Sequence, residues 1–401
     1  MPFLATRGYA MGVSASTCRI SCAVLASCTL ACAAPPQAPQ PPVKTEFVDG
    51  LILVDVTLSG VHGWWLLDSG YECSVLDSTA ARTLGVRTSP PKKTRAPGGD
   101  INQASARGLA LQLSSETFRP DSVAVVPLVQ LSPIVGRPIT GILGHDFFER
   151  HVVTIDYAKR EILLAGGDTW TAPAGVSQLP VWIEAGETFV LGTFWVAGRT
   201  VPAKLKLDTG SLSGLGLNGS FVMQNRLFPE SWPRRPIEGI AVGGATRNFV
   251  ARLDSMALGA TVILSPVAGW SEDLTRVGDA GTLGAPILAR FRLTFDYARR
   301  RLLLVPRPDA TRREAWEGAG MFVGQIPDGS VIVIQVIPGT PAESAGIAAG
   351  DVLLRVGGVD ARAIGLDTLR SRFRRSGRLD SLVISRGGKQ RSVELRQTDL
   401  P

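Results

Sequence analysis

The feature that most constrains this chain is a set of three sequence markers that occur twice with one common offset. The first pair of markers starts at residues 68 and 208, the second ends at 144 and 284, and the third has its aspartates at 156 and 296. The pairs are Asp68–Gly70 with Asp208–Gly210, Ile142–Gly144 with Thr282–Gly284, and Thr154–Tyr157 with Thr294–Tyr297. One offset at three places indicates internal duplication, and its length predicts that each copy is a whole lobe rather than a short repeat unit.

Each copy resembles a lobe of the aspartic proteases. The first marker is an apolar run followed by Asp-Ser/Thr-Gly, and the second is the apolar-apolar-Gly strand that this family threads beside it. The sequence of Gly141–Phe148 resembles that of the bacterial retropepsin-like branch, and the resemblance extends over about residues 45 to 308. A single Asp-Ser-Gly would be an ordinary turn, but two copies in register imply a mainly β, double-lobed fold.

The resemblance implies a catalytic dyad of Asp68 and Asp208. Two carboxyl groups a hydrogen bond apart cannot both ionise cheaply, so the pair shares a proton. The ionised member can then take a proton from water while the protonated member donates to a peptide carbonyl. Water is the nucleophile, so the site needs no cofactor and no metal.

The residues after each aspartate are expected to support the dyad. In the family, the hydroxyls at Ser69 and Thr209 brace the lobes, although a local turn contact is compatible with this role. Gly70 and Gly210 lack a side chain and leave room for backbone close to the carboxylates.

Each copy also contains a Gly-Gly turn between extended segments. These turns, at Gly98 and Gly99 and at Gly243 and Gly244, are candidate flaps, since a hairpin at this place folds over the substrate in the family. Plain surface hairpins are an equally good interpretation. Neither turn offers a tyrosine, which favours the retropepsin-like comparison over pepsin.

The last ninety or so residues resemble a bacterial PDZ domain, an α+β module. The motif runs through Pro338–Ile347 and Gly350–Gly358. Gly318, Gly320 and Met321 lie in the loop that holds a peptide C-terminal carboxylate in this family, and the helix near Leu366–Phe373 should form the other wall of the groove. The alternative is that the module only packs on the protease or binds an internal segment.

Composition agrees with a globular, strand-rich chain. Apolar residues make up 45% and charged residues 19% of 401 residues, with 44 Gly and 27 Pro at turns between short apolar runs. The runs that read as strands are Leu51–Leu58, Thr188–Ala197, Val201–Leu207 and Arg292–Phe295.

A net charge of +7 permits nucleic-acid binding, but no recognition motif accompanies it. The arginines are scattered except for Arg370, Arg372, Arg374, Arg375 and Arg378, which we interpret as a solvated helix face. We therefore expect no nucleic-acid partner.

The first 44 residues have the outline of an export signal followed by a Pro-rich tether. Leu25–Cys28 resembles a bacterial lipobox, which makes Cys28 the candidate lipidation site and predicts an envelope protein whose only membrane contact is a lipid anchor. Ordinary signal cleavage near Ala33 or Ala34 would instead give a periplasmic or secreted protein.

Only Cys73 of the five cysteines lies in the folded body, where we expect a small buried thiol. His145 and Asp146 could be drawn as metal ligands, but a catalytic zinc site normally has three protein ligands, so no metal is expected.

These observations predict four segments: 1–44 as leader and tether, 45–172 and 173–308 as the protease lobes, and 309–401 as the PDZ domain. The predicted function is an exported aspartic endopeptidase, active as a monomer, that cleaves protein or peptide substrates and binds C-terminal peptides in its PDZ groove. The alternative is a catalytically silent peptide-binding scaffold of the cell envelope.

Overall fold

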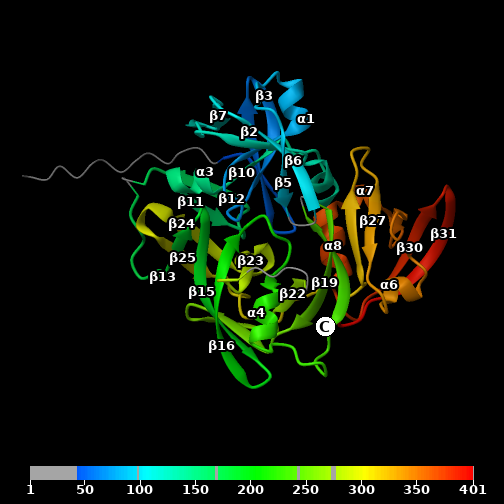
Figure 1. Ribbon diagram of the computed structural model, residues 1–401. Helices are drawn as coiled ribbons and strands as arrows, with labels where there is room; N and C mark the ends of the chain where they lie inside the picture. The colour runs from blue at the N-terminus through cyan, green and yellow to red at the C-terminus, as the bar shows by residue number, and fades with distance from the viewer. Residues whose placement is uncertain (1–42, 97–98, 168–169, 242–243, 272–276, 401) are drawn as a thin grey trace, which may run out of the picture. The chain divides into compact units, whose positions relative to one another are not determined.

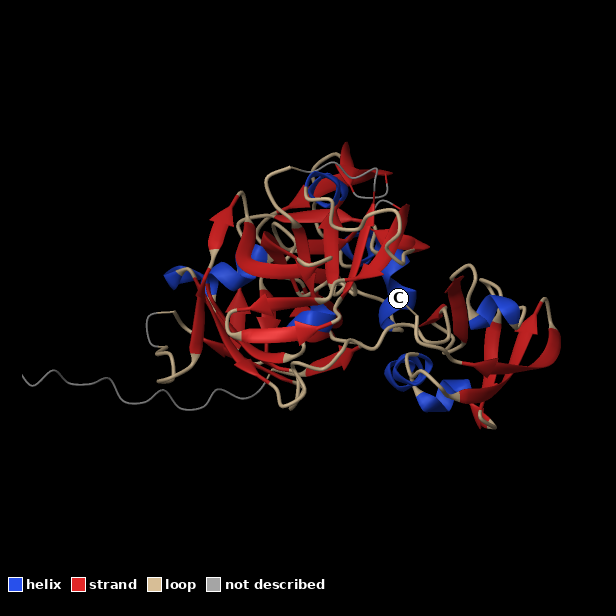
Figure 2. Cartoon of the chain, turned by 90° about the horizontal axis from the view of Figure 1, so that it is seen from below, coloured by secondary structure: helices blue, strands red, loops and turns tan. Residues whose placement is uncertain are grey.

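The computed structural model describes residues 43–400, except 97–98, 168–169, 242–243 and 272–276. Strands dominate these residues, and short helices lie at their ends (Figure 2). The fold class is mainly β, with an α+β module at the end of the chain, as the sequence predicts. Residues 1–42 of the predicted leader and tether, Cys28 included, lie outside the described residues, whereas Val43 and Lys44 pack on the first lobe.

The first lobe is built on one sheet in which β3 and β10 lie side by side. The strand order is β5-β6-β9-β4-β10-β3-β2-β7-β8, and β1 pairs with β2. Its strands are β1 (Thr45–Val48), β2 (Leu51–Leu58), β3 (Val61–Leu67), β4 (Val75–Asp77), β5 (Lys92–Ala96), β6 (Gly99–Ala106), β7 (Leu111–Leu113), β8 (Glu116–Phe118), β9 (Val123–Val126) and β10 (Gly141–Leu143).

The second lobe repeats this order strand for strand, which confirms the duplication. Its sheet runs β18-β19-β22-β17-β23-β16-β15-β20-β21, and β14 pairs with β15 as β1 does with β2. Figure 1 labels β15, β16, β19, β22 and β23 of this sheet. Its strands are β14 (Trp182–Glu184), β15 (Glu187–Val196), β16 (Arg199–Asp208), β17 (Leu215–Asn218), β18 (Arg235–Ala241), β19 (Gly244–Arg252), β20 (Ser255–Leu258), β21 (Thr261–Leu264), β22 (Val267–Ser271) and β23 (Gly281–Gly284).

The two lobes share a third sheet, to which the third sequence marker belongs. Its order is β12-β11-β24-β25-β13, with β11 (Val152–Asp156), β12 (Glu161–Ala165), β13 (Ser177–Pro180), β24 (Phe291–Asp296) and β25 (Arg301–Pro306). Thr154 pairs with Thr294 across β11 and β24, and their hydroxyl oxygens are 2.9 Å apart. Because these two residues are equivalent in the duplication, the pseudo-twofold axis passes between them.

The short helices are also duplicated in part. α3 follows β10 as α5 follows β23, and α1 follows β4 as α4 follows β17. The helical segments of the lobes are α1 (Ser78–Thr83), η1 (Val129–Leu131), α2 (Ser132–Val135), α3 (His145–Arg150), α4 (Gly219–Gln224), α5 (Ala285–Leu288) and η2 (Tyr297–Arg299). One apolar core runs through both lobes and includes Trp65, Phe148, Phe194 and Phe295, each fully buried.

The PDZ module has its own sheet and its own apolar core around Leu369 and Phe373. The strand order is β26-β27-β28-β30-β31, and β29 pairs with β28. The elements are β26 (Met321–Gln325), β27 (Val331–Val336), α6 (Pro341–Ser344), β28 (Val352–Val356), β29 (Val359–Asp360), α7 (Ala361–Ile364), α8 (Leu366–Phe373), β30 (Leu379–Arg386) and β31 (Lys389–Arg396).

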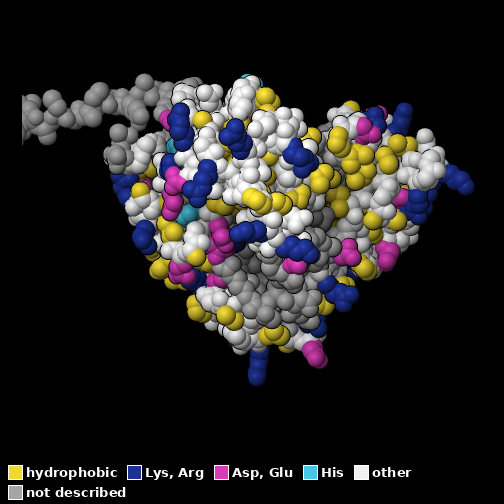
Figure 3. All heavy atoms as spheres, turned by 45° about the horizontal axis from the view of Figure 1, so that its top comes forward, with side chains coloured by type: hydrophobic (Ala, Val, Ile, Leu, Met, Phe, Trp, Pro, Cys, Tyr) yellow, Lys and Arg dark blue, Asp and Glu magenta, His cyan; other side chains and the backbone are white. Residues whose placement is uncertain are grey.

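Most of the arginine cluster near α8 is not the solvated face that the sequence suggested, although Arg375 is exposed. Arg370 is 7% exposed, and its guanidinium donates twice to the Val323 carbonyl. Arg374 is paired with Asp49 and Glu317. These arginines are therefore structural ion-pair partners. Elsewhere, on the face shown in Figure 3, the basic side chains are scattered among acidic ones.

No helix in the described part of the chain is long and apolar enough to cross a membrane.

Candidate active site

The two aspartates stand at equivalent ends of equivalent strands. Asp68 directly follows β3, and its amide donates to the Leu143 carbonyl of β10 at 2.9 Å. Asp208 ends β16, whose parallel partner β23 places Gly284 opposite it. The last three residues of β3 are buried and apolar, and every second residue of β16 from Val201 to Leu207 is buried, so each carboxyl is fixed by a strand that is anchored in the core of its lobe.

The glycines show how closely the two carboxyls approach each other. A Cβ atom added to Gly70 would lie 2.3 Å from the Asp208 Cγ, and one added to Gly210 would lie 2.3 Å from the Asp68 Cγ. Each motif glycine therefore packs against the carboxyl of the other lobe, and no other residue fits there. The close approach expected at Gly70 and Gly210 thus occurs across the pseudo-twofold axis.

Each carboxyl also accepts a hydrogen bond from within its own motif. The Gly70 amide donates to Asp68 Oδ1 at 2.9 Å, and the Gly210 amide donates to Asp208 Oδ1 at 3.1 Å. These bonds fix one oxygen of each side chain. Burial raises the pKa of the Asp68 carboxyl, and Asp208 lies close enough for its charge to raise this pKa further, as is expected of two carboxyls that share a proton.

The motif hydroxyls form a reciprocal set of hydrogen bonds between the lobes. Thr209 Oγ1 donates to the Leu67 carbonyl at 2.8 Å and accepts from the Ser69 amide at 3.0 Å. In the opposite sense, Ser69 Oγ donates to the Leu207 carbonyl at 3.1 Å and accepts from the Thr209 amide at 3.2 Å. Ser69 and Thr209 are fully buried, so these four bonds hold the two motifs together without competition from water.

Burial and like charge act together on Asp68. Desolvation, and then the Asp208 charge, raise the pKa of Asp68 well above its ordinary value, while the Gly70 amide and the Lys206 ammonium lower it. Nearby, burial raises the pKa of Tyr71 to about 12. A carboxyl held protonated beside a second carboxyl can donate a proton at a pH where an ordinary aspartate cannot.

The candidate flaps are two equivalent hairpins, β5–β6 and β18–β19. Ala96 pairs with Gly99, and Ala241 pairs with Gly244, so each hairpin is closed by a two-residue loop. Gly98 and Gly243 lie in these loops, outside the described residues. Ile101, which pairs with Thr94 in the first hairpin, belongs to the apolar cluster against which Tyr71, three residues after Asp68, also packs. A covering role for either hairpin stays a prediction.

The loop before β26 is already hydrogen-bonded within the PDZ module. The Ala319 amide donates to the Phe373 carbonyl at 2.8 Å, and the Gly320 amide donates to the Glu317 carbonyl at 2.8 Å. A Cβ added to Gly320 would lie 2.2 Å from the Thr340 Cβ. Met321 is buried and begins β26. Carboxylate capture at Gly318, Gly320 and Met321 would require these amides to change partners, and it stays a prediction.

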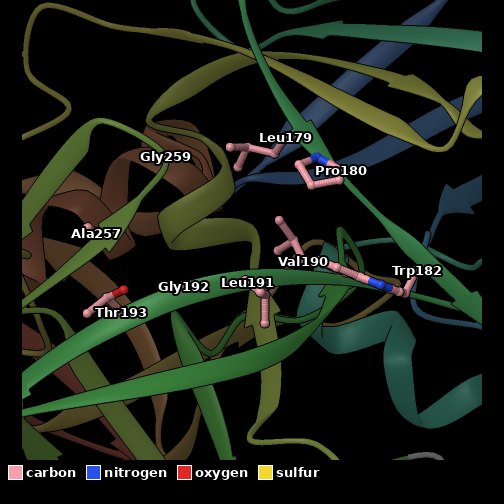
Figure 4. Close-up of a pocket in the computed structure, with 9 residues that line it drawn as sticks. All are labelled: Leu179, Pro180, Trp182, Val190, Leu191, Gly192, Thr193, Ala257 and Gly259. Atoms are coloured by element: carbon pink, nitrogen blue, oxygen red, sulfur yellow. The ribbon is translucent and has the colours of Figure 1, made fainter. Parts of the chain in front are cut away.

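A pocket of about 220 Å³ lies apart from both motifs, on the second lobe (Figure 4). Its walls come from β13, β14, β15 and β20 and include Leu179, Trp182, Val190 and Leu191. No side chain in its lining titrates, so acid–base chemistry belongs to the aspartate site. Among the described residues, no three His, Cys, Asp or Glu side chains are grouped as metal ligands.

Two side chains of the site were missed by the sequence analysis. Lys206, two residues before Asp208, donates to the Gly70 carbonyl at 3.2 Å, and it is paired with Glu187 at 3.3 Å. One signal for Lys206 was present in the sequence. Lys206 is a charged residue inside the otherwise apolar run Leu205–Leu207, and it shares a strand face with Asp208 because residues two apart on a strand point to the same side. Nothing in the sequence marks Glu187 as its partner.

The comparisons with known proteins agree with this geometry. Residues 54–147 match the aspartyl protease family, and residues 312–384 match the PDZ domain family. The chain contains a retropepsin-like aspartyl protease domain and a PDZ domain. The family match lies within the first lobe, and the second lobe has the same strand order and the same motif.

Two curated proteins are similar over part of their length. "Putative serine protease HhoB" of Synechocystis is 26% identical over 154 residues, which is 38% of this chain and 33% of that protein. "Carboxyl-terminal-processing protease" of Picosynechococcus is 43% identical over 58 residues, 14% of each chain. The chain thus spans about a third of the first relative and less of the second. The matched family and both relatives are named as proteases, but these names do not fix a catalytic type for this chain.

Proposed function

We propose that this protein is an aspartic endopeptidase whose water nucleophile is activated by Asp68 and Asp208. The observation that carries the proposal is the reciprocal approach of the two motifs, in which each glycine packs against the carboxyl of the opposite lobe. Both members of the dyad lie on one chain, so a single copy can supply the site.

The proposed reaction needs one proton between the two carboxyls. The ionised carboxylate accepts a proton from water as the water oxygen attacks the peptide carbonyl, and the protonated carboxyl donates to the carbonyl oxygen. The tetrahedral intermediate then collapses as a carboxyl protonates the leaving nitrogen. The raised pKa of Asp68 supports this scheme because it keeps a proton on the pair above the range of an ordinary aspartate.

A serine mechanism, which the name of one relative suggests, fits the three histidines poorly. In a catalytic triad, one imidazole nitrogen faces the acid and the other faces the nucleophile. At His62, the oxygens of Asp55 and Thr57 both contact Nδ1. Thr188, the hydroxyl next to His145, is fully buried and cannot meet a substrate. His151 Nδ1 contacts a backbone carbonyl. The aspartic type is therefore the one that the described geometry supports.

The PDZ module is proposed to bind C-terminal peptides of substrates or partners. β26 is an edge strand of its sheet, the kind of strand to which a peptide can add. A Cβ added to Gly324 would lie 2.6 Å from the Pro133 carbonyl of α2, so α2 packs against one face of this strand.

Export and lipidation at Cys28 complete the proposal. If Cys28 carries the lipid, Cys28→Ala should yield an uncleaved precursor or a protein that is no longer extracted with membranes. Mass spectrometry of the mature N-terminus decides this, and an unlipidated chain that begins at Ala33 or Ala34 would overturn the lipobox interpretation.

The test of the proposed activity is peptide cleavage. The chain from residue 39, which forms one compact unit, is incubated with a diverse peptide pool beside its Asp208→Asn variant. The proposal expects cleavage by the wild type alone. Cleavage by both proteins would overturn the dyad, and peptide binding without cleavage by the folded wild type would favour the silent scaffold.

A further inference from the structure

The two lobes differ in charge at one position beside the aspartates. On β16, Lys206 precedes Asp208 by two residues and lies on the same side of the strand. The equivalent residue of the first lobe, at the duplication offset, is Leu66, which is 4% exposed in the apolar core. A lysine thus stands on one side of a site that is otherwise symmetric in its motifs.

The Lys206 ammonium is held by groups from both lobes. Its Nζ donates to the Gly70 carbonyl of the first lobe at 3.2 Å and lies 3.3 Å from Glu187 Oε1. The Lys206 and Glu187 side chains are 18% and 9% exposed, so the pair is shielded from water. Glu187 closes the β14–β15 hairpin as the buried, apolar Leu51 closes the β1–β2 hairpin, and the ion pair therefore exists only on the Asp208 side.

We propose that Lys206 is a positioning residue that fixes the Gly70 carbonyl and biases the shared proton toward Asp68, so that Asp208 is the carboxylate that accepts the proton of water. This inference rests on the proposed function and specifies which of the two carboxyls holds the shared proton. A buried ammonium favours the ionised form of a nearby carboxyl. Lys206 shares a strand with Asp208, whereas it reaches the first lobe through the Gly70 carbonyl.

The surrounding charges agree with this assignment. The charges of Asp208, Glu187 and Asp68, in that order, raise the pKa of Lys206 against its desolvation, so the ammonium form persists. From the strands on either side of β16, uncharged Phe189 and Thr282 pair with Lys206. The phenols of Tyr71 and Tyr297 also lie near Asp68, and the charges of Cys73 and Glu72 act on Tyr71 and that of Glu149 on Tyr297. Burial raises the pKa of each phenol, so both stay neutral in the acid range.

The proposal predicts opposite pH shifts for the two members of the ion pair. Lys206→Met removes a positive charge, so both limbs of the pH–rate profile should move to higher pH, by roughly one unit. Glu187→Gln leaves the ammonium uncompensated, so both limbs should move to lower pH. Lys206→Arg keeps the charge and should leave the limbs near their wild-type positions.

The experiment measures initial rates against pH for these variants of the chain from residue 39, using a peptide that the wild type cleaves. Because Lys206→Met leaves a buried Glu187 without its ammonium, Lys206→Met/Glu187→Gln serves as a charge-neutral control whose limbs should fall between those of the single variants. In parallel, ¹³C NMR follows the carboxyl titrations of Asp68 and Asp208, assigned with Asp68→Asn and Asp208→Asn. This second measurement needs no activity.

Opposite shifts in Lys206→Met and Glu187→Gln, with rescue by Lys206→Arg, support the inference. Lower rates or lower stability without movement of the limbs would reduce Lys206 to a structural residue and overturn it, as would a titration in which Asp208 keeps the proton longer than Asp68. If the wild type cleaves no peptide, the proposed function fails. The carboxyl titrations then still decide whether Lys206 orders the pair.

Discussion

At the scale of single residues, the position of Asp68 beside Asp208 lowers the free energy of unfolding at neutral pH. Desolvation and the Asp208 charge raise its folded-state pKa, so the folded protein holds this proton more tightly than the unfolded chain. The stabilisation that the bound proton provides is fully present below the ordinary aspartate pKa. It is lost as the pH rises through the raised folded-state value.

We therefore predict that Asp68→Asn stabilises the fold at neutral pH. Asparagine keeps the shape of the side chain and removes the charge, so the gain in free energy of unfolding over wild type should be small near pH 3 and grow as the pH rises to 7. Thermal unfolding of both proteins across this range measures it. A gain that is independent of pH, or a loss at neutral pH, would contradict the assigned pKa direction.

Gly70 is a residue where one added carbon should abolish activity. In Gly70→Ala the new Cβ would lie 2.3 Å from the Asp208 Cγ, so the carboxyls must separate, and we expect at least a hundredfold loss of kcat/KM, about 2.7 kcal/mol or more. Gly216→Ala is the matched control, because its Cβ would make only ordinary contacts, the nearest at 3.7 Å. Similar activities in the two variants would show that the close approach is unimportant.

At the scale of elements, the site depends on loops tied together across the lobe interface. The Thr209 hydroxyl donates to one backbone group and accepts from another, and its loss would leave both partners buried without a hydrogen bond. Ser69 makes the equivalent contacts in the opposite direction. The strands supply rigid positions for the carboxyls, and the hydroxyls fix the distance between the strands.

Thr209→Val should therefore destabilise the protein by about 2–4 kcal/mol, since each unsatisfied buried group costs about 1–3 kcal/mol. Valine keeps the volume, so lost packing contributes little. Chemical denaturation reads the change, and Thr209→Ser, which retains the hydroxyl, should recover most of it. Equal losses in the two variants would assign the effect to the methyl group rather than to the hydrogen bonds.

The elements differ in how far the sequence predicted them. The run Leu51–Leu58 coincides with β2, and α8 has the predicted bounds Leu366–Phe373, because apolar periodicity reports local structure. The approach of the two Asp-Ser/Thr-Gly motifs was predictable because they repeat in register. Lys206 with Glu187, and Arg374 with Asp49, join residues 19 and 325 positions apart. Such pairs depend on tertiary packing, which no local pattern encodes, so Arg374 was interpreted as solvated.

At the scale of the whole molecule, the segment after the second lobe is part of the protease. Glu314 Oε2 accepts from the Val267 amide at 2.9 Å. The Glu314 carbonyl accepts from Arg252 at 2.9 Å. A Cβ added to Gly214, six residues after Asp208, would lie 2.9 Å from the Glu314 carboxylate. A truncation at residue 309 would thus remove Glu314, which is buried against the second lobe, along with the PDZ module.

We predict that removal of residues 318–401, which keeps Glu314, leaves cleavage of short peptides within about threefold of wild type. Longer substrates with a free apolar C-terminus should show a raised KM and unchanged kcat, because a second binding site supplies effective concentration rather than chemistry. Steady-state kinetics on both substrates, with circular dichroism to verify the fold, measure this. Loss of short-peptide cleavage in a folded protein would mean that the module completes or gates the active site.

The measurement that tests the central claim most directly is the pH dependence of peptide cleavage by wild type, Asp68→Asn and Asp208→Asn. A dyad that shares one proton gives a bell-shaped profile whose two limbs belong to the pair, and both asparagine variants should stay at background at every pH. A rate that rises with pH to a plateau near neutrality, as expected for a histidine base, or an asparagine variant that keeps most of the wild-type rate, would contradict the two-carboxylate account.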